Sequence, residues 1–301
     1  MTTEPSEVAV SPQLRSGGGG YSVLILTYNE AANIERCLES LAGCDDVVVM
    51  DSFSTDETPA HLERRQVRVF QRAFDTFAGQ RNWAIDNVPF KYPWVLHLDA
   101  DECLTPALDR EIRKVADRDE KSAYLLANKL MFMGRWIKRA SMYPYYQARL
   151  LRIGESRFVQ TGHGQTLGST SRGVGTLREP YLHYNFSKGI SDWITRHNRY
   201  STDEAARIGS HSGSWFGAMK QAICGRTQQE KQQGRKRLAD AMPCRPVVRF
   251  GYLFFWRLGL LDGMAGFHYC MLMAIYDYFI RLKCREARLS HGEQAEQTVS
   301  R

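Results

Sequence analysis

The feature that most constrains the fold is the regular alternation of short apolar runs with helix-like segments in the first 120 residues. The runs "YSVLILT" and "DVVVM" are typical of buried strands, and "VRVF" and "WVLHL" are typical of a third and a fourth strand. Helix-start signals follow several of them, among them Thr105 as an N-cap before Pro106. Strands that alternate with helices in this way predict an α/β fold with a mostly parallel sheet flanked by helices.

Three of these strands end in polar residues, at positions 27–30, at Asp51, and at Asp99 and Asp101. In a parallel sheet the carboxyl ends lie at one edge, which is where ligands bind. Two carboxylates one residue apart can reach the same divalent cation, and Mg²⁺ and Mn²⁺ prefer carboxylate and phosphate oxygens. A helix N-terminus, where acidic residues are common, is the alternative. The coincidence of three clusters favours a site for a metal and a diphosphate.

The stretches "LILTYNEAANIERCLESL", "VVVMDSFSTDET", "AGQRNWA" and "VLHLDADE" resemble, in order and spacing, the family 2 glycosyltransferases with a GT-A fold. The resemblance covers about residues 21–130. It implies Mn²⁺ or Mg²⁺ as cofactor, with Asp101 as the direct ligand and Asp99 beside it, and Arg81 near the phosphates. It also implies a nucleotide-sugar site made of Thr27, Tyr28, Asn29, Glu30, Asp51, Ser54, Arg81, Asp99, Ala100 and Asp101. Simple turn, cap and surface roles are the alternatives for Tyr28, Asn29, Asp51 and Arg81.

The stretch from 134 to 165 resembles a subgroup that elongates bacterial surface polysaccharide and lipopolysaccharide core. That subgroup often carries a His-Glu pair where this chain has His163, Gly164 and Gln165. Glutamine cannot take a proton at neutral pH, whereas histidine can, so His163 is the candidate base or acceptor-positioning residue. The alternatives are a structural histidine and a phosphate acceptor that needs no base. The expected catalytic residues are therefore His163, Asp101 and Arg81.

Basic residues in this second half are candidates for holding a phosphorylated or sugar-bearing acceptor. They are Arg149, Lys188, Arg196 and Arg199. For the last three, a helix that packs back on the catalytic domain is an equally good interpretation.

The C-terminal part is basic and aromatic, with 13 Lys or Arg against 5 Asp or Glu in residues 220–290. Charges and glycines interrupt residues 247–284 too often for a plain spanning helix, which needs about 20 mainly apolar residues. Two amphipathic pieces, near 247–261 and 267–284, fit a membrane interface better. A buried helical hairpin or a dimer interface is the alternative.

The predicted organisation is a disordered tail (1–20), a GT-A catalytic domain (21–210), an amphipathic membrane-association region (211–290) and a second disordered tail (291–301). The predicted function is that of an inverting glycosyltransferase at the cytoplasmic face of the inner membrane. It would move a sugar from a UDP-sugar to a lipid-linked saccharide or a polyprenyl-phosphate type of acceptor in surface-glycan biosynthesis. We expect no nucleic-acid partner and allow for a homo-oligomer. A metal-dependent nucleotidyltransferase and a non-catalytic nucleotide-sugar-binding adaptor are the rival interpretations.

Overall fold

The computed structural model describes residues 19–161, 164–209, 215–224, 234 and 244–299. The chain divides into two compact units. One, here the sheet unit, comprises residues 1–131 and 143–187, and the other, here the helical unit, comprises 132–142 and 188–301. The division differs from the predicted boundary at residue 210, because the helix that begins at residue 189 packs with the C-terminal helices rather than with the sheet.

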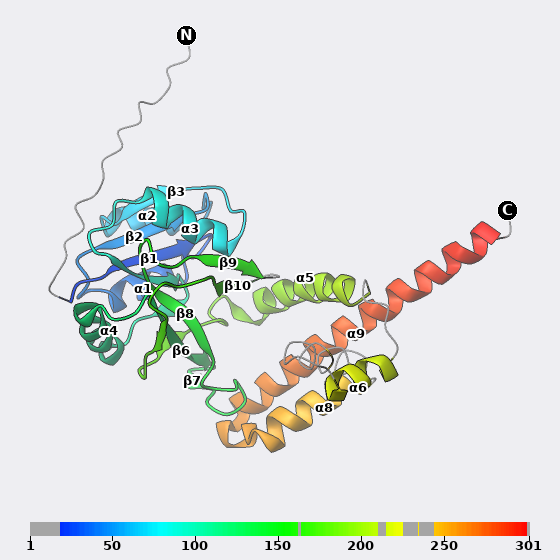
Figure 1. Cartoon of the computed structure of the whole chain (residues 1–301). Helices are drawn as coiled ribbons and strands as arrows, with labels where there is room; N and C mark the ends of the chain where they lie inside the picture. The colour runs from blue at the N-terminus through cyan, green and yellow to red at the C-terminus, as the bar shows by residue number, and fades with distance from the viewer. Residues whose placement is uncertain (1–18, 162–163, 210–214, 225–233, 235–243, 300–301) are drawn as a thin grey trace, which may run out of the picture. The chain divides into compact units, whose positions relative to one another are not determined.

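The first half of the sheet unit contains the predicted alternation of strands and helices (Figure 1). Four strands lie side by side in the order β3-β2-β1-β4, and all three pairings are parallel. Thr105 caps α4 as predicted, its side chain accepting a hydrogen bond from the Leu108 backbone N–H at 3.2 Å. The elements are β1 (Ser22–Thr27), α1 (Ile34–Ser40), β2 (Val47–Asp51), α2 (Thr58–Arg64), β3 (Arg68–Gln71), α3 (Phe77–Asn87), β4 (Trp94–Asp99) and α4 (Pro106–Arg118).

The second half turns the sheet into a mixed one. Strand β8 lies antiparallel between β4 and β6, while β12 is parallel to β6 and antiparallel to β5. No helix lies between β6 and β8, so the chain returns antiparallel in β8, whereas β12 becomes a parallel neighbour of β6 only after the longer connection through β8 to β11. The strands are β5 (Glu102–Cys103), β6 (Ala123–Phe132), β8 (Tyr146–Arg152), β9 (Phe158–Thr161), β10 (Gly164–Leu167), β11 (Val174–Thr176) and β12 (Tyr181–His183).

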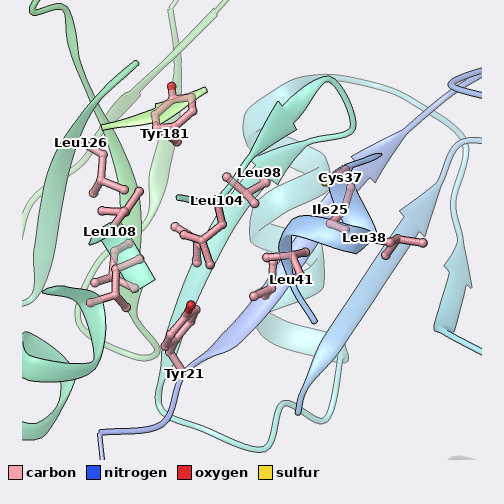
Figure 2. Close-up of a cluster of buried hydrophobic side chains, with 14 of the residues drawn as sticks. Tyr21, Ile25, Cys37, Leu38, Leu41, Leu98, Leu104, Leu108, Leu126 and Tyr181 are labelled. Carbon is pink, nitrogen blue, oxygen red and sulfur yellow. The ribbon is translucent and has the colours of Figure 1, made fainter. Parts of the chain in front are cut away.

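The largest cluster of buried apolar side chains lies on one face of the sheet, where α1 and α4 cover it (Figure 2). Leu96 and Leu98 of β4 point into this cluster, whereas Val95 packs with α3 residues on the other face. Because side chains alternate along a strand, His97 and Asp99 lie on the α3 face with Val95. The alternation therefore directs Asp99 toward α3.

In the helical unit, α5 (Gly189–Gly209) and α8 (Arg245–Gly251) both pack against α9 (Gly263–Val299) (Figure 1). Polar contacts join these helices as well as apolar ones. Buried Asp277 pairs with Arg245 at 3.2 Å and Arg249 at 2.9 Å. Helix α9 reaches Val299, so the predicted boundary at residue 290 falls inside it. The remaining elements are β7 (Arg135–Trp136), α6 (Trp215–Cys224), a π-helical turn (Tyr252–Trp256) and a 3₁₀ turn (Gly259–Asp262).

One aspartate ties segment 132–142 to the rest of the helical unit. The Asp262 carboxylate accepts hydrogen bonds from the backbone N–H groups of Lys138, Arg139 and Ala140 at 3.2, 2.8 and 2.9 Å. A buried carboxylate with three donors is well satisfied, and the three N–H groups have few alternatives. This contact is the local reason why the segment belongs to the helical unit although it lies between two strands in sequence.

Candidate functional site

The carboxyl ends of β1, β2 and β4 lie at one edge of the sheet, as the sequence predicts. Thr27 is the register partner of Asp51, and Leu26 is the partner of Asp99. Backbone hydrogen bonds continue this pairing just past the strands, from Ser52 N–H to the Thr27 carbonyl and from Ala100 N–H to the Leu26 carbonyl. The three polar clusters are therefore neighbours in space.

The loops after β1 and β2 are locked together by side-chain hydrogen bonds. The Ser54 hydroxyl accepts from Asn29 N–H at 2.8 Å, and the Asn29 side-chain carbonyl accepts from Thr55 N–H at 2.8 Å. Asp51 is buried and accepts from both the N–H and the hydroxyl of Ser54. Asp51 and Asn29 thus fix the conformation of the two loops, while Tyr28, which directly precedes Asn29, is 57% exposed.

The other two residues of the first cluster, Glu30 and Thr27, differ in their hydrogen bonding. The Glu30 backbone N–H donates to the Thr58 hydroxyl at 2.8 Å, and its carboxylate accepts from the Asn33 side-chain amide at 2.7 Å. The Thr27 side-chain hydroxyl is buried and has no hydrogen-bond partner within the described structure. Whether any residue of these loops contacts a nucleotide stays a prediction.

Asp99 belongs to an ionic cluster of two acids and two arginines, in which its own side chain is 31% exposed and the other three are buried. It accepts from Arg81 at 2.6 Å and from Arg149 at 3.1 Å, and Arg149 also donates to Glu102 at 2.5 Å. The two arginines are only 2% and 4% exposed, and Glu102 is fully buried. Such charges are tolerated in a protein interior because each one has an opposite partner.

The two carboxyl groups of this cluster titrate in opposite directions. Burial raises the pKa of Asp99, but the nearby Arg81 and Arg149 outweigh it and leave the pKa at about 2. For Glu102 burial dominates over the attraction of Arg149, and the pKa rises to about 7. Asp99 is therefore ionised at neutral pH and bonded to both arginines. Its observed role is to hold these arginines in place, and its predicted role as a metal ligand stays a prediction.

Asp101 has a neighbour that the sequence analysis did not single out. Its carboxylate lies 3.3 Å from Nε2 of His183 on β12, which pairs with β5 so that His183 is the register partner of Glu102. Burial lowers the pKa of His183, but the attraction of Asp101 and its hydrogen bond prevail and raise it to about 9. Proximity across 82 positions cannot be read from spacing; the only sequence signal is a polar residue that ends a short apolar strand.

Asp101 and His183 bring a carboxylate and an imidazole together, and the imidazole would have to lose its proton before it could bind a divalent cation. Within the described parts of the chain no group of three or more His, Cys, Asp or Glu side chains could hold a metal ion alone. Mg²⁺ in phosphate-transfer sites is commonly held by one or two protein ligands plus substrate oxygens and water. An oxygen donor beside an imidazole fits Mn²⁺ at least as well. The donor set therefore fits a cation that arrives with its nucleotide.

The predicted acceptor residues fall in both units. Arg149 belongs to the ionic cluster of the sheet unit, where it is buried and pairs with Asp99 and Glu102. In the helical unit, Arg196 pairs with Asp192 at 2.8 Å and Arg199 lies over the Tyr200 ring, while Lys188 directly precedes α5. His163, the candidate base, lies outside the described residues. These acceptor and base roles stay predictions.

The turn region between α8 and α9 exposes many large apolar side chains. Trp256 is 80% and Phe255 62% exposed. They are joined by exposed Val247, Val248, Tyr252, Leu258, Leu260, Leu261 and Met264. Over the described residues no single helix is long and apolar enough to cross a membrane. The two helical segments Arg245–Trp256 and Gly259–Ala287, which meet at a bend of 71°, are together long and apolar enough to do so by length and composition alone.

Residues 22–172 match the family described as Glycosyl transferase family 2. An uncharacterized glycosyltransferase of Rickettsia bellii (strain RML369-C) is 28% identical over 89% of this chain and 87% of its own length. The lipopolysaccharide core biosynthesis glycosyltransferase LpsC of Rhizobium meliloti (strain 1021) is 26% identical over 85% of this chain and 91% of its own. Among solved structures, S. aureus TarS 1–349 is similar with a TM-score of 0.42 and 16% identity, over 90% of this chain and 92% of that chain.

Proposed function

The chain belongs to glycosyl transferase family 2, and we propose that it transfers a sugar with inversion from a UDP-sugar to a lipid-linked saccharide or polyprenyl-phosphate type of acceptor in bacterial surface-glycan biosynthesis. The enzyme class follows from the family. The surface-glycan assignment is supported by the similarity to LpsC over most of both chains. The observation that carries the donor site is the meeting of Thr27, Asp51 and Asp99 at one sheet edge, next to the Asp101–His183 pair.

The chain's own residues bind the donor and prepare its leaving group. Asp101 and His183 would hold Mn²⁺ or Mg²⁺, which when bound would neutralise charge on the diphosphate. Arg81 and Arg149 bring fixed positive charge beneath this edge, while Asp99 and Glu102 hold the two guanidinium groups in place.

In the reaction an acceptor oxygen forms a bond to the anomeric carbon as the bond from that carbon to the diphosphate oxygen breaks. A hydroxyl acceptor must lose its proton, and His163 is our proposed base for this. A phosphate acceptor is already ionised and needs none. A transfer assay with the wild type and a His163→Ala variant tests this role, because a rate that does not change in the variant excludes His163 as the base.

The proposal is tested by incubating the full chain with a panel of UDP-sugars and Mn²⁺ and measuring both UDP release and UDP binding. UDP-sugar consumption that requires Asp101 supports it. Binding of UDP without turnover on any lipid-linked acceptor would favour the non-catalytic adaptor. Release of pyrophosphate from a nucleoside triphosphate would favour the nucleotidyltransferase.

We also propose that the exposed turn region, within residues 247–284, contacts the cytoplasmic face of the inner membrane. Tryptophan and other aromatic side chains favour the bilayer interface, and the flanking basic residues suit anionic lipids. In vesicle sedimentation with anionic phospholipid, the wild type should bind and a Phe255→Ser, Trp256→Ser double variant should bind at least about tenfold more weakly. Dimerisation that is lost in this variant, without vesicle binding by the wild type, would instead identify a homo-oligomer interface.

A further inference from the structure

Phe53, in the loop after β2, has a backbone conformation that a bulky residue rarely adopts. Its φ is +59°, in the left-handed region, and its side chain is 53% exposed. That region is sterically costly for a residue with a large side chain and favours glycine. An exposed phenylalanine in this conformation contributes little to a core, so its position calls for a reason other than folding.

The surrounding loop holds this conformation rigidly. On one side, Ser52 N–H donates to the Thr27 carbonyl at 2.9 Å. On the other, Ser54 is fixed both by the Asp51 carboxylate and by Asn29 N–H. Hydrogen bonds on both sides of Phe53 thus over-determine the backbone, which is the condition under which strain persists at functional positions. The ring is presented from a fixed loop.

A second exposed ring stands at the end of the neighbouring strand. Tyr28 follows Thr27, whose register partner is Asp51, and Phe53 follows Asp51 by two positions. The Asn29–Ser54 hydrogen bond joins the two loops directly beyond these rings. Two exposed aromatic residues are therefore carried by adjacent loops at the edge that also bears Asp99 and Asp101.

The spacing of the strands suits the two ends of a nucleoside diphosphate. Strand β2 is separated from β4 by β1 alone, so their ends are about 10 Å apart at roughly 4.8 Å per strand. An extended nucleoside diphosphate has a comparable separation between its base and its distal phosphate. With the diphosphate near Asp101, the base would reach the loops after β1 and β2.

We propose that Phe53 is a nucleobase-binding residue of the donor site, whose ring packs on one face of the nucleobase while Tyr28 packs on the other. The inference rests on the proposed nucleotide-sugar function and deepens it. Stacking of an aromatic ring on a base contributes about 1–3 kcal/mol to binding, and a side chain without a planar ring loses this contribution. The strained backbone at Phe53 is then the structural cost of placing that ring.

Calorimetry of the full chain with UDP, and separately with inorganic pyrophosphate, both with Mn²⁺, tests this proposal. In Phe53→Gly the Kd for UDP should rise about 5- to 100-fold, while the Kd for pyrophosphate stays the same. Because glycine relieves the left-handed strain, the Tm should stay equal or rise by up to about 3 °C. Phe53→Leu keeps the bulk and the strain but lacks a planar ring, so it should weaken UDP without gaining Tm.

Gln66 provides a matched control. It is exposed, has a φ of +53°, and lies between α2 and β3, at the opposite edge of the sheet. Gln66→Gly should give a similar Tm change and leave UDP binding unaltered.

Three results would overturn the inference. The first is a UDP affinity in Phe53→Gly and Phe53→Leu that equals that of the wild type. The second is an equal weakening of UDP and pyrophosphate binding, and the third is a loss of Tm in both variants large enough to explain their weaker binding. Wild-type protein that binds pyrophosphate but not UDP would overturn the inference together with the proposed donor.

Discussion

Replacement of Arg149 by methionine tests whether this residue stabilises the buried ionic cluster or contacts the acceptor. The substitution removes the cation that bonds Asp99 at 3.1 Å and Glu102 at 2.5 Å, and it keeps an unbranched apolar side chain of related length. Asp99 retains Arg81 as a partner, whereas Glu102 loses the arginine that it bonds at 2.5 Å while remaining fully buried. The main consequence should therefore fall on Glu102.

Removing one partner of a buried ion pair costs about 3–5 kcal/mol. At pH 7 we expect the lower value, about 3 kcal/mol, because Glu102 already has a pKa of about 7 and can become neutral. In the wild type this raised pKa means that stability falls as the pH rises from the unfolded value of about 4.5 to about 7, and then levels off. Without Arg149 the pKa rises further, so the variant should keep losing about 1.4 kcal/mol per pH unit above 7.

Urea unfolding of the wild type and of Arg149→Met at pH 6, 7 and 8 measures both effects. Adding Glu102→Gln should remove the extra slope above pH 7, because no carboxyl group remains to titrate. Arg157 pairs with Asp86 on the surface of the same unit, and Arg157→Met is the control, expected to cost at most about 1 kcal/mol. Equal losses in the two arginine variants would refute the buried-network reasoning. A raised acceptor KM in a variant of unchanged stability would restore Arg149 as an acceptor contact.

Three further predictions concern the metal pair and the helical unit. Asp101→Asn and His183→Ala should each weaken Mn²⁺-dependent UDP binding about tenfold or more; unchanged titrations would remove these residues from the metal site. Burial lowers the pKa of His197, stacked on Trp193, to about 4, so the unfolded chain binds more protons between pH 4 and 6.5. Stability of the helical unit should therefore fall as the pH decreases through that window, and a flat profile for wild type would contradict this. Asp262→Ala leaves three backbone N–H groups without their acceptor and should cost about 2–4 kcal/mol in thermal unfolding of that unit.

The parallel half of the sheet could be predicted because its signals are local. The apolar runs mark the strands, cap signals such as Thr105 mark helix starts, and the crossover rule then orders the carboxyl ends. The mixed half was predicted less well, because short antiparallel strands such as β11 and β12 carry little periodicity. The partners of Asp99 and Asp101 were predicted only in part. The sequence places Arg81 near the phosphates, but its bond to Asp99 depends on strand alternation and on the packing of α3 against the sheet.

The sequence by itself determined the family, the order of strands and helices in residues 21–120, and the gathering of Thr27, Asp51 and Asp99 at one edge. These depend on neighbours in the chain and on the handedness of βαβ connections. Only the tertiary structure decided that His183 faces Asp101, that Arg149 is a buried partner of Glu102, and that Phe53 is held in a left-handed backbone. Each of these joins residues far apart in sequence or depends on loop hydrogen bonds, and packing of the whole unit is what brings such groups within a few ångströms.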